Sequence, residues 1–241
     1  MKILYTLFLI IGFCIQAVSQ VSLFPIEIND SSDNPKKYYI QLEYPNIKDF
    51  PDVNIQEKIN SNINSFINKS TEDFKIDLKD WELPNTELRD MASGFYVSYE
   101  AVSSKNVFSL ILYFDHYFVG TAHPSHESHT MNFNLSDGNL IKFEELFDKN
   151  KNYLSKISEL CIKYLKNKNE DMPSDDDWIK NGAGPVADNF NNFNIKPECL
   201  LITFDPYQVG AYALGYQSVE ILYKDIEDIV NKNGPLKEFY K

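Results

Sequence analysis

The sequence has few of the residues on which most catalytic and metal sites depend. Of 241 residues, 4 are histidine, 3 are cysteine, 2 are tryptophan and 9 are glycine. It contains no G-x-S-x-G nucleophile elbow, no glycine-rich phosphate loop and no H-E-x-x-H zinc motif. These absences favour a non-catalytic protein without a cofactor, and we assign no catalytic residue. Paired carboxylates of the glycosidase kind remain open, because they leave no local motif.

Positive charge is also scarce. The chain has 23 Lys and Arg against 35 Asp and Glu, a formal net charge of −12. A surface this acidic is repelled by the phosphates of nucleic acids and by anionic lipids, whereas basic partners are attracted. We therefore expect no nucleic-acid partner.

Long apolar runs are confined to the N-terminus, in "MKILYTLFLIIGFCIQAVSQ". The apolar stretch from Ile3 to Ile15 is shorter than the ~20 residues that span a bilayer. Its basic start and the small residues before Gln20 predict a signal peptide over residues 1–19, cleaved after Ser19. Export to the periplasm or the extracellular space follows, with no membrane span after cleavage. Removing Lys2 lowers Lys and Arg from 23 to 22, so the mature charge is −13.

Two cysteines remain after such a cleavage, Cys161 and Cys199. An even pair in an oxidising compartment favours a disulfide. Cys161 is expected on the apolar face of a helix and Cys199 at the start of a strand, so packing of that helix on its sheet would join them. The alternative is two separately buried thiols.

Hydrophobic periodicity predicts an α+β fold. Alternating apolar residues indicate strands at 36–45, 94–103, 107–120, 128–135, 193–206 and 218–223, with a hairpin turn at 103–106. Three-four spacing indicates helices at 51–70, with Asp52 as N-cap, and at 151–168, and a closing helix is expected at 224–234. This order predicts a mostly antiparallel sheet with two or three packed helices, in two intimate subdomains.

All four histidines lie in "HYFVGTAHPSHESHT", residues 116–130. His123, His126 and His129 are spaced by three, which on a helix would suit a metal ion. Pro124 and the strand-like surroundings argue against a helix, and residues three apart in an extended segment point to opposite faces. We therefore expect no metal site and keep these three histidines as a weaker alternative.

Two stretches carry a family resemblance. "YFVGTAHPSHESHTMNFNLSDGNLIKFEELF" and "ITFDPYQVGAYALGYQSVEILYKDIEDIV" resemble the extracytoplasmic domain of the RsiV/PdaC-like family, found in a lysozyme-sensing anti-sigma factor and beside the catalytic domain of a peptidoglycan deacetylase. Thr121 and Ala211 depart from its usual glycine and proline. The resemblance implies an N-terminal PdaC-like subdomain over residues 20–105 and a C-terminal RsiV-like domain over 106–241.

The resemblance covers the binding domain alone, so neither deacetylase chemistry nor sigma-factor binding is carried over. It implies recognition of a protein such as lysozyme, or of cell-wall peptidoglycan. The candidate ligand-binding residues are His123, Pro124, Tyr207, Gly210, Tyr212, Gly215 and Tyr216. In a second interpretation the tyrosines are structural and stack on the hairpin. The alternative function is an exported metal-assisted hydrolase or deacetylase acting on envelope glycan through His123.

Overall fold

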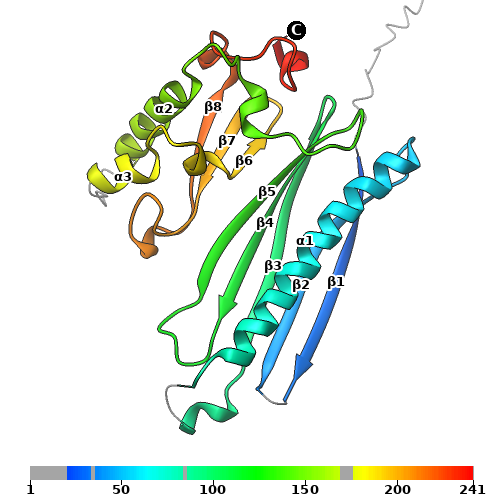
Figure 1. The fold of residues 1–241 in the computed structure, drawn as a ribbon, viewed down its shortest axis with the longest axis vertical. Helices are drawn as coiled ribbons and strands as arrows, with labels where there is room; N and C mark the ends of the chain where they lie inside the picture. Colours follow the sequence, from blue (N-terminus) through cyan, green and yellow to red (C-terminus); the bar gives the residue numbers. More distant parts are fainter. Residues whose placement is uncertain (1–20, 34–35, 84–85, 169–175, 241) are drawn as a thin grey trace, which may run out of the picture.

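The computed structural model describes residues 21–33, 36–83, 86–168 and 176–240. The fold is α+β and mostly antiparallel, as predicted, and has two units (Figure 1). The larger unit is a five-stranded sheet in the order β1-β2-β3-β4-β5, and the smaller is a three-stranded sheet in the order β6-β7-β8. The strands of the larger sheet are β1 (Ser22–Ser32), β2 (Tyr38–Lys48), β3 (Ser93–Ser104), β4 (Val107–Tyr117) and β5 (Ser125–Asn134). The smaller unit contains α2 (Tyr153–Lys168), α3 (Asp176–Gly182), β6 (Phe193–Ile195), β7 (Cys199–Phe204) and β8 (Gln217–Leu222).

The long helix α1 (Val53–Asp80) covers one face of the larger sheet (Figure 1). Asp52 is its N-cap, as predicted, and its side chain accepts from the backbone N–H groups of Asn54 and Ile55. The helix runs ten residues beyond the predicted end, because the buried stripe continues through Phe74 and Leu78. None of the helices that the structure describes covers the opposite face of this sheet.

Strand β2 lies between β1 and β3 in the larger sheet. It pairs with β1 in antiparallel register and with β3 in parallel register, the latter only from Tyr38 to Leu42. The sequence predicted that Pro45 ends this strand, but β2 continues to Lys48. Pro45 is tolerated because it lies beyond the β3 pairing, where β2 has a neighbour on one side only. Strand β1 was not predicted.

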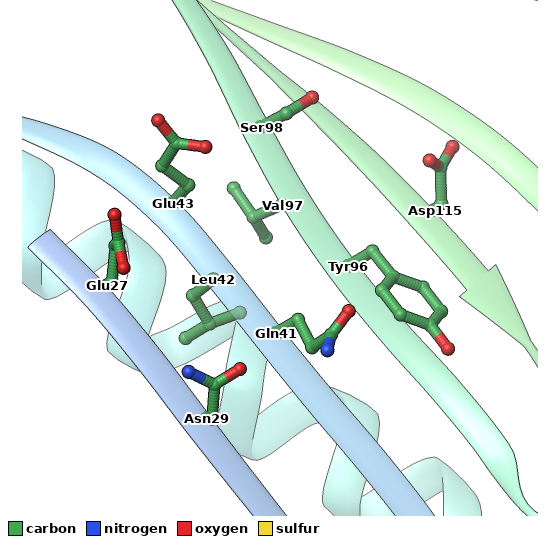
Figure 2. Close-up of a pocket in the computed structure, with 9 residues that line it drawn as sticks. All are labelled: Glu27, Asn29, Gln41, Leu42, Glu43, Tyr96, Val97, Ser98 and Asp115. Carbon is green, nitrogen blue, oxygen red and sulfur yellow. The ribbon is translucent and has the colours of Figure 1, made fainter. Parts of the chain in front are cut away.

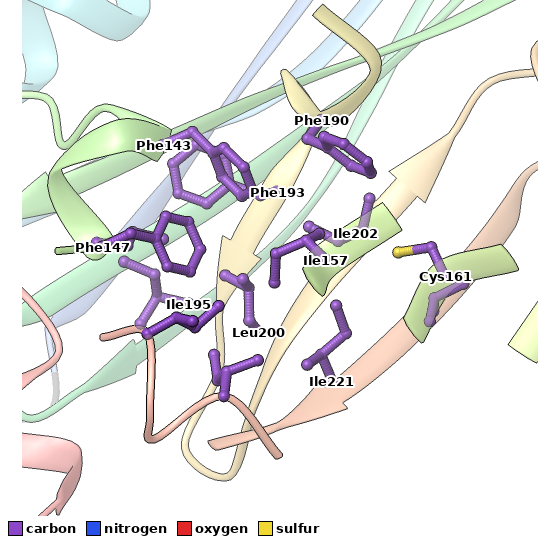
Figure 3. Packing of buried hydrophobic residues seen from close by; sticks show 14 of the residues in the cluster. Phe143, Phe147, Ile157, Cys161, Phe190, Phe193, Ile195, Leu200, Ile202 and Ile221 are labelled. Atoms are coloured by element: carbon purple, nitrogen blue, oxygen red, sulfur yellow. The ribbon is translucent and has the colours of Figure 1, made fainter. Parts of the chain in front are cut away.

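The smaller unit has its own apolar core between its sheet and α2 (Figure 3). Ile157, Cys161 and Leu165 point from α2 into this core, where they meet Leu200 and Ile202 of β7. The predicted strand at 193–206 is two strands, β6 and β7, joined by a tight turn in which Lys196 N–H donates to the carbonyl of Cys199.

The predicted disulfide is not formed: Cys161 and Cys199 are both buried free thiols. Side chains alternate along β7, so Leu200 and Ile202 face the core that contains Cys161, whereas Cys199 is outside that core. The two sulfurs therefore belong to different sides of the sheet. Burial raises the pKa of Cys161 to about 12.

The predicted closing helix at 224–234 is also wrong. Only a short 3-10 turn, Tyr223–Asp225, forms at its start. The residues after this turn form backbone hydrogen bonds with residues 146–148 instead. Asn231 N–H donates to the carbonyl of Leu146, and Asp148 N–H donates to the carbonyl of Ile229. Tertiary pairing of the backbone thus replaces the helical hydrogen bonds.

The two units meet through polar side chains on the helix-free face of β5. Ser128, Thr130 and Asn132 alternate along the strand, and each bonds to the smaller unit. Asn132 Nδ2 donates to the carbonyl of Phe193 at 2.8 Å, and Thr130 Oγ1 accepts from the N–H of the same residue at 3.0 Å. This row fixes where the smaller unit stands on the larger sheet.

The expected division between residues 105 and 106 falls in the turn between β3 and β4, which are hydrogen-bonded neighbours in one sheet. The core of the larger unit includes residues from Val21 to Leu135, and that of the smaller unit runs from Ile141 to Leu236, with Val107 joining it. The expected signal peptide, residues 1–19, lies outside the described residues. None of the described helices has the length and apolar character needed to cross a bilayer.

Candidate functional site

Two segments far apart in the sequence meet where the smaller unit approaches the larger sheet. They are the loop between β4 and β5 (residues 118–124) and the loop between β7 and β8 (residues 205–216), here called the tyrosine loop. The rings of His123 and Tyr212 stack with centroids 3.9 Å apart and planes at 26°. Tyr212 Oη donates to the carbonyl of Pro124 at 3.0 Å, and Tyr207 Oη lies 3.3 Å from His123 Nε2. Four of the predicted binding residues are thus brought together.

These residues surround a cavity of about 400 Å³, here called the tyrosine pocket. Its aromatic wall is formed by His123, Tyr207 and Tyr212, and its carboxylates are Glu127 and Asp205. The remaining lining residues are Thr121, Ala122, Pro124, Ser125, His126 and Pro206. Tyr207 is 53% exposed, so its ring is accessible to a ligand. Pockets that combine aromatic walls with a few polar groups are the usual form of small-molecule sites.

The tyrosine loop is held from behind by α3 and the turn that follows it. Trp178 Nε1 donates to the carbonyl of Tyr207 at 2.7 Å, and Tyr207 has a positive φ of 72°. Gln208 Nε2 donates to the carbonyls of Gly182 and Asn189 at 3.0 and 3.1 Å. A Cβ atom on Gly182 would lie 1.8 Å from the carbonyl oxygen of Gln208, so glycine is required for this close approach.

Asp205 lies at the base of the pocket, where the two units meet. Its carboxylate accepts from the backbone N–H of Ser128 at 2.9 Å and from the Ser128 hydroxyl, and Asn192 Nδ2 lies 3.5 Å away. Burial raises the pKa of Asp205, and the nearby Glu127 adds to this, whereas the Ser128 hydrogen bonds oppose it. The sequence reading missed Asp205, because a single carboxylate in an acidic chain carries no local signal.

His126 forms the wall between this pocket and the helix-free face of the larger sheet. Its Nδ1 contacts the Asp115 carboxylate, and its ring stacks on Tyr212 with centroids 5.4 Å apart. Tyr216 Oη donates to the carbonyl of Glu127 at 3.0 Å, and its ring packs edge-on against Tyr113 at 5.2 Å. Burial, with Glu100 adding to it, raises the pKa of Tyr113 to about 12.

The other two histidines face α1, on the opposite side of the sheet. His129 stacks on Phe66 with centroids 4.0 Å apart, and His116 lies edge-on to Phe95 at 4.8 Å. The alternative metal site of His123, His126 and His129 is therefore not formed, because strand alternation turns His129 away from the other two. In the described part of the chain no group of three or more potential ligands could hold a metal ion.

Three further predicted residues contribute to the shape of the tyrosine loop but do not line the pocket: Gly210, Gly215 and Tyr216. Gly215 has a φ of +61° at the end of the short 3-10 turn Tyr212–Leu214, a conformation that glycine adopts without strain. The structural role considered from the sequence is confirmed for two of the tyrosines. Tyr212 and Tyr216 bind the loops together, while Tyr207 faces outward.

The protein is thus an α+β protein of two units, with the tyrosine pocket where the units meet. Residues 144–224 match the family described as Protein of unknown function (DUF3298), so the chain contains a DUF3298 domain. This match includes the tyrosine loop and ends before the C-terminal turns. The loop that carries His123 lies outside the matched residues.

The chain is 28% identical over 207 residues to the peptidoglycan-N-acetylmuramic acid deacetylase PdaC of Bacillus subtilis. The similarity covers 86% of this chain but only 42% of that relative. Two solved structures of DUF3298 proteins share the fold. One, from Bacteroides fragilis, has a TM-score of 0.64 and 14% identity, with 92% of this chain and 98% of that one covered. The other, from Pseudomonas aeruginosa, has a TM-score of 0.59 and 10% identity, with 88% and 95% covered.

Proposed function

We propose that this chain is an exported, non-catalytic binding module of the cell envelope, and that it recognises glycan in the tyrosine pocket. The observation that carries the proposal is the exposed ring of Tyr207 beside His123, above the carboxylates of Glu127 and Asp205. Aromatic rings offer broad, stiff surfaces on which the apolar faces of sugar rings stack. Carboxylates accept hydrogen bonds from sugar hydroxyls.

The similarity to PdaC supports an envelope ligand, since that relative is named for its action on peptidoglycan. Export rests on the N-terminal segment "MKILYTLFLIIGFCIQAVSQ". The alternative of a metal-assisted hydrolase would use His123 with nearby carboxylates. Of the three spaced histidines that suggested it, His129 stacks on Phe66 and does not join the other two. Metal analysis of the purified protein tests that alternative: stoichiometric zinc that His123→Ala removes would support it.

A basic protein such as lysozyme is the second candidate ligand. The net charge of −12 favours it, because opposite charges accelerate encounter and stabilise the complex. This candidate predicts a steep fall in affinity with salt, whereas stacking of an uncharged glycan on Tyr207 predicts little salt dependence.

The experiment is titration calorimetry with soluble N-acetylated peptidoglycan fragments and, separately, with lysozyme, each at low and physiological salt. We expect the glycan to bind and Tyr207→Ala to weaken it at least about tenfold, the equivalent of 1.4 kcal/mol. The matched control is Tyr164→Ala, an exposed tyrosine on α2 away from the pocket. Unchanged affinity in Tyr207→Ala would refute the assignment of the pocket.

A further inference from the structure

The helix-free face of the larger sheet has a second hollow, of about 320 Å³, here called the acidic hollow, which is lined by residues of β1 to β4 (Figure 2). Figure 2 shows Glu27 and Asn29 from β1, Gln41 and Glu43 from β2, and Tyr96 from β3 on this face, with α1 behind the sheet. The charged groups that line it, Glu27, Glu43 and Asp115, are all carboxylates.

Two of these carboxylates, those of Glu27 and Glu43, are placed where they destabilise the sheet. Glu27 and Glu43 are direct partners in the antiparallel register of β1 and β2. Like charges in directly opposite positions of a sheet repel one another and destabilise it. Both side chains are exposed, and in the residues that the structure describes neither forms an ion pair with a lysine or arginine. A cationic ligand would relieve this repulsion.

The two hollows are neighbours on the sheet, on either side of the pair Asp115 and His126. Asp115 lines the acidic hollow, His126 lines the tyrosine pocket, and the two residues are register partners on β4 and β5 whose side chains touch. Tyr96 is the register partner of Asp115 on the other side and is 39% exposed. Neighbouring strands are about 4.8 Å apart, so the path from β1 to β5 is roughly 19 Å long. That length suits a chain of several units.

We propose that this face extends the glycan site and binds sugars that carry free ammonium groups, as N-deacetylated amino sugars do. The inference rests on the proposed function and specifies the charge of its ligand. Tyr96 and Tyr207 supply stacking surfaces at two points of the path, and Glu27, Glu43 and Asp115 supply the negative charge. Ammonium groups also interact favourably with tyrosine ring faces.

An extended basic peptide is the competing occupant. Peptides that bind to sheets usually add to an edge, where unpaired backbone groups give hydrogen bonds. The acidic hollow lies on the face of the sheet, among residues of β1, β2, β3 and β4, where the parallel pairing of β2 with β3 ends at Leu42 and Val97. The exposed rings of Tyr96 and Tyr207 favour a sugar chain over a peptide, because they offer stacking surfaces to sugar rings.

The test compares two glucosamine hexamers in the same β-1,4 linkage, one fully N-acetylated and one fully deacetylated, at a pH that keeps the amines protonated. We expect the deacetylated hexamer to bind about tenfold tighter at 20 mM salt, and the advantage to shrink at 500 mM salt. The double variant Glu27→Gln with Glu43→Gln should abolish this advantage while leaving the affinity for the acetylated hexamer unchanged.

The charge-matched control is Glu57→Gln with Glu159→Gln, two exposed glutamates on α1 and α2 away from both hollows. Equal binding of the two hexamers would overturn the inference and leave the proposed function standing. If neither hexamer binds, both proposals fail. Binding of an oligolysine peptide in place of the deacetylated hexamer, sensitive to the same glutamate variants, would assign the face to a basic polypeptide and overturn the inference.

Discussion

The imidazole ring of His123 stacks on the phenol ring of Tyr212, across 89 positions of sequence, with centroids 3.9 Å apart. The Tyr212 hydroxyl also donates to the carbonyl of Pro124. Two interactions of different kinds therefore join the loop after β4 to the tyrosine loop. Together they shape the wall of the tyrosine pocket.

Substitution of Tyr212 separates these two interactions. Tyr212→Phe keeps the ring and loses one hydrogen bond, so we expect the free energy of unfolding to fall by about 1 kcal/mol. Tyr212→Ala also loses the aromatic stack, worth a further ~0.5–1.5 kcal/mol, and should weaken glycan binding as well. Urea unfolding measures both variants. Equal losses in the two would show that the stack contributes nothing.

Glycine at position 182 permits the contact between α3 and the tyrosine loop. Gly182→Ala places a methyl group 1.8 Å from the carbonyl oxygen of Gln208, and backbone must move to accommodate it. We expect a loss of about 1–3 kcal/mol, as for other overpacked sites, together with weaker ligand binding. The neighbouring exposed position serves as the control, since Asn181→Ala should change neither property. A Gly182→Ala protein with wild-type stability would contradict the described packing.

The two partly buried histidines, His116 and His129, predict a loss of stability in acid. Burial lowers the pKa of both His116 and His129 below the usual value of 6.5. Below pH 6.5 the unfolded chain therefore binds protons that the folded protein does not. The free energy of unfolding falls as the pH drops from 6.5 towards the pKa values of these histidines in the folded state. Above pH 6.5 these two groups no longer change it.

Unfolding measured between pH 7.5 and pH 5 checks this dependence. His129→Phe preserves a ring against Phe66 and should reduce the acid sensitivity. His123→Gln, which changes an exposed imidazole, should leave it intact. The interpretation is wrong if the free energy of unfolding of His129→Phe falls with decreasing pH as steeply as that of the unmodified protein.

The free thiols give a chemical prediction. In protein lacking residues 1–19, two thiols should react with a thiol reagent after denaturation without reductant, from Cys161 and Cys199. In the native state Cys161 should be unreactive, because burial keeps it protonated. A reducing agent should leave the melting temperature unchanged. Fewer than two thiols in the denatured protein would reveal a disulfide that the fold does not contain.

Much of the fold could be predicted from local pattern. The buried stripes of α1 and α2, the Asp52 cap and the turn between β3 and β4 follow from spacing that is visible in a few residues. Strand β1 was missed because its side chains are mostly exposed and lack alternation. The closing helix was predicted from periodicity in 224–234, and backbone pairing with residues 146–148 prevented it.

The candidate site could also be predicted only in part from the sequence. The sequence alone determined the acidic charge, the confinement of histidines to residues 116–130 and the aromatic character of the tyrosine loop. Only the tertiary structure decided that His123 meets Tyr207 and Tyr212 while His129 turns away, and that Asp205 bonds to Ser128. Contacts between residues 77 to 89 positions apart depend on how one sheet docks on another. No spacing along the chain encodes that docking, because it is set by the fit of two cores and a row of polar side chains between them.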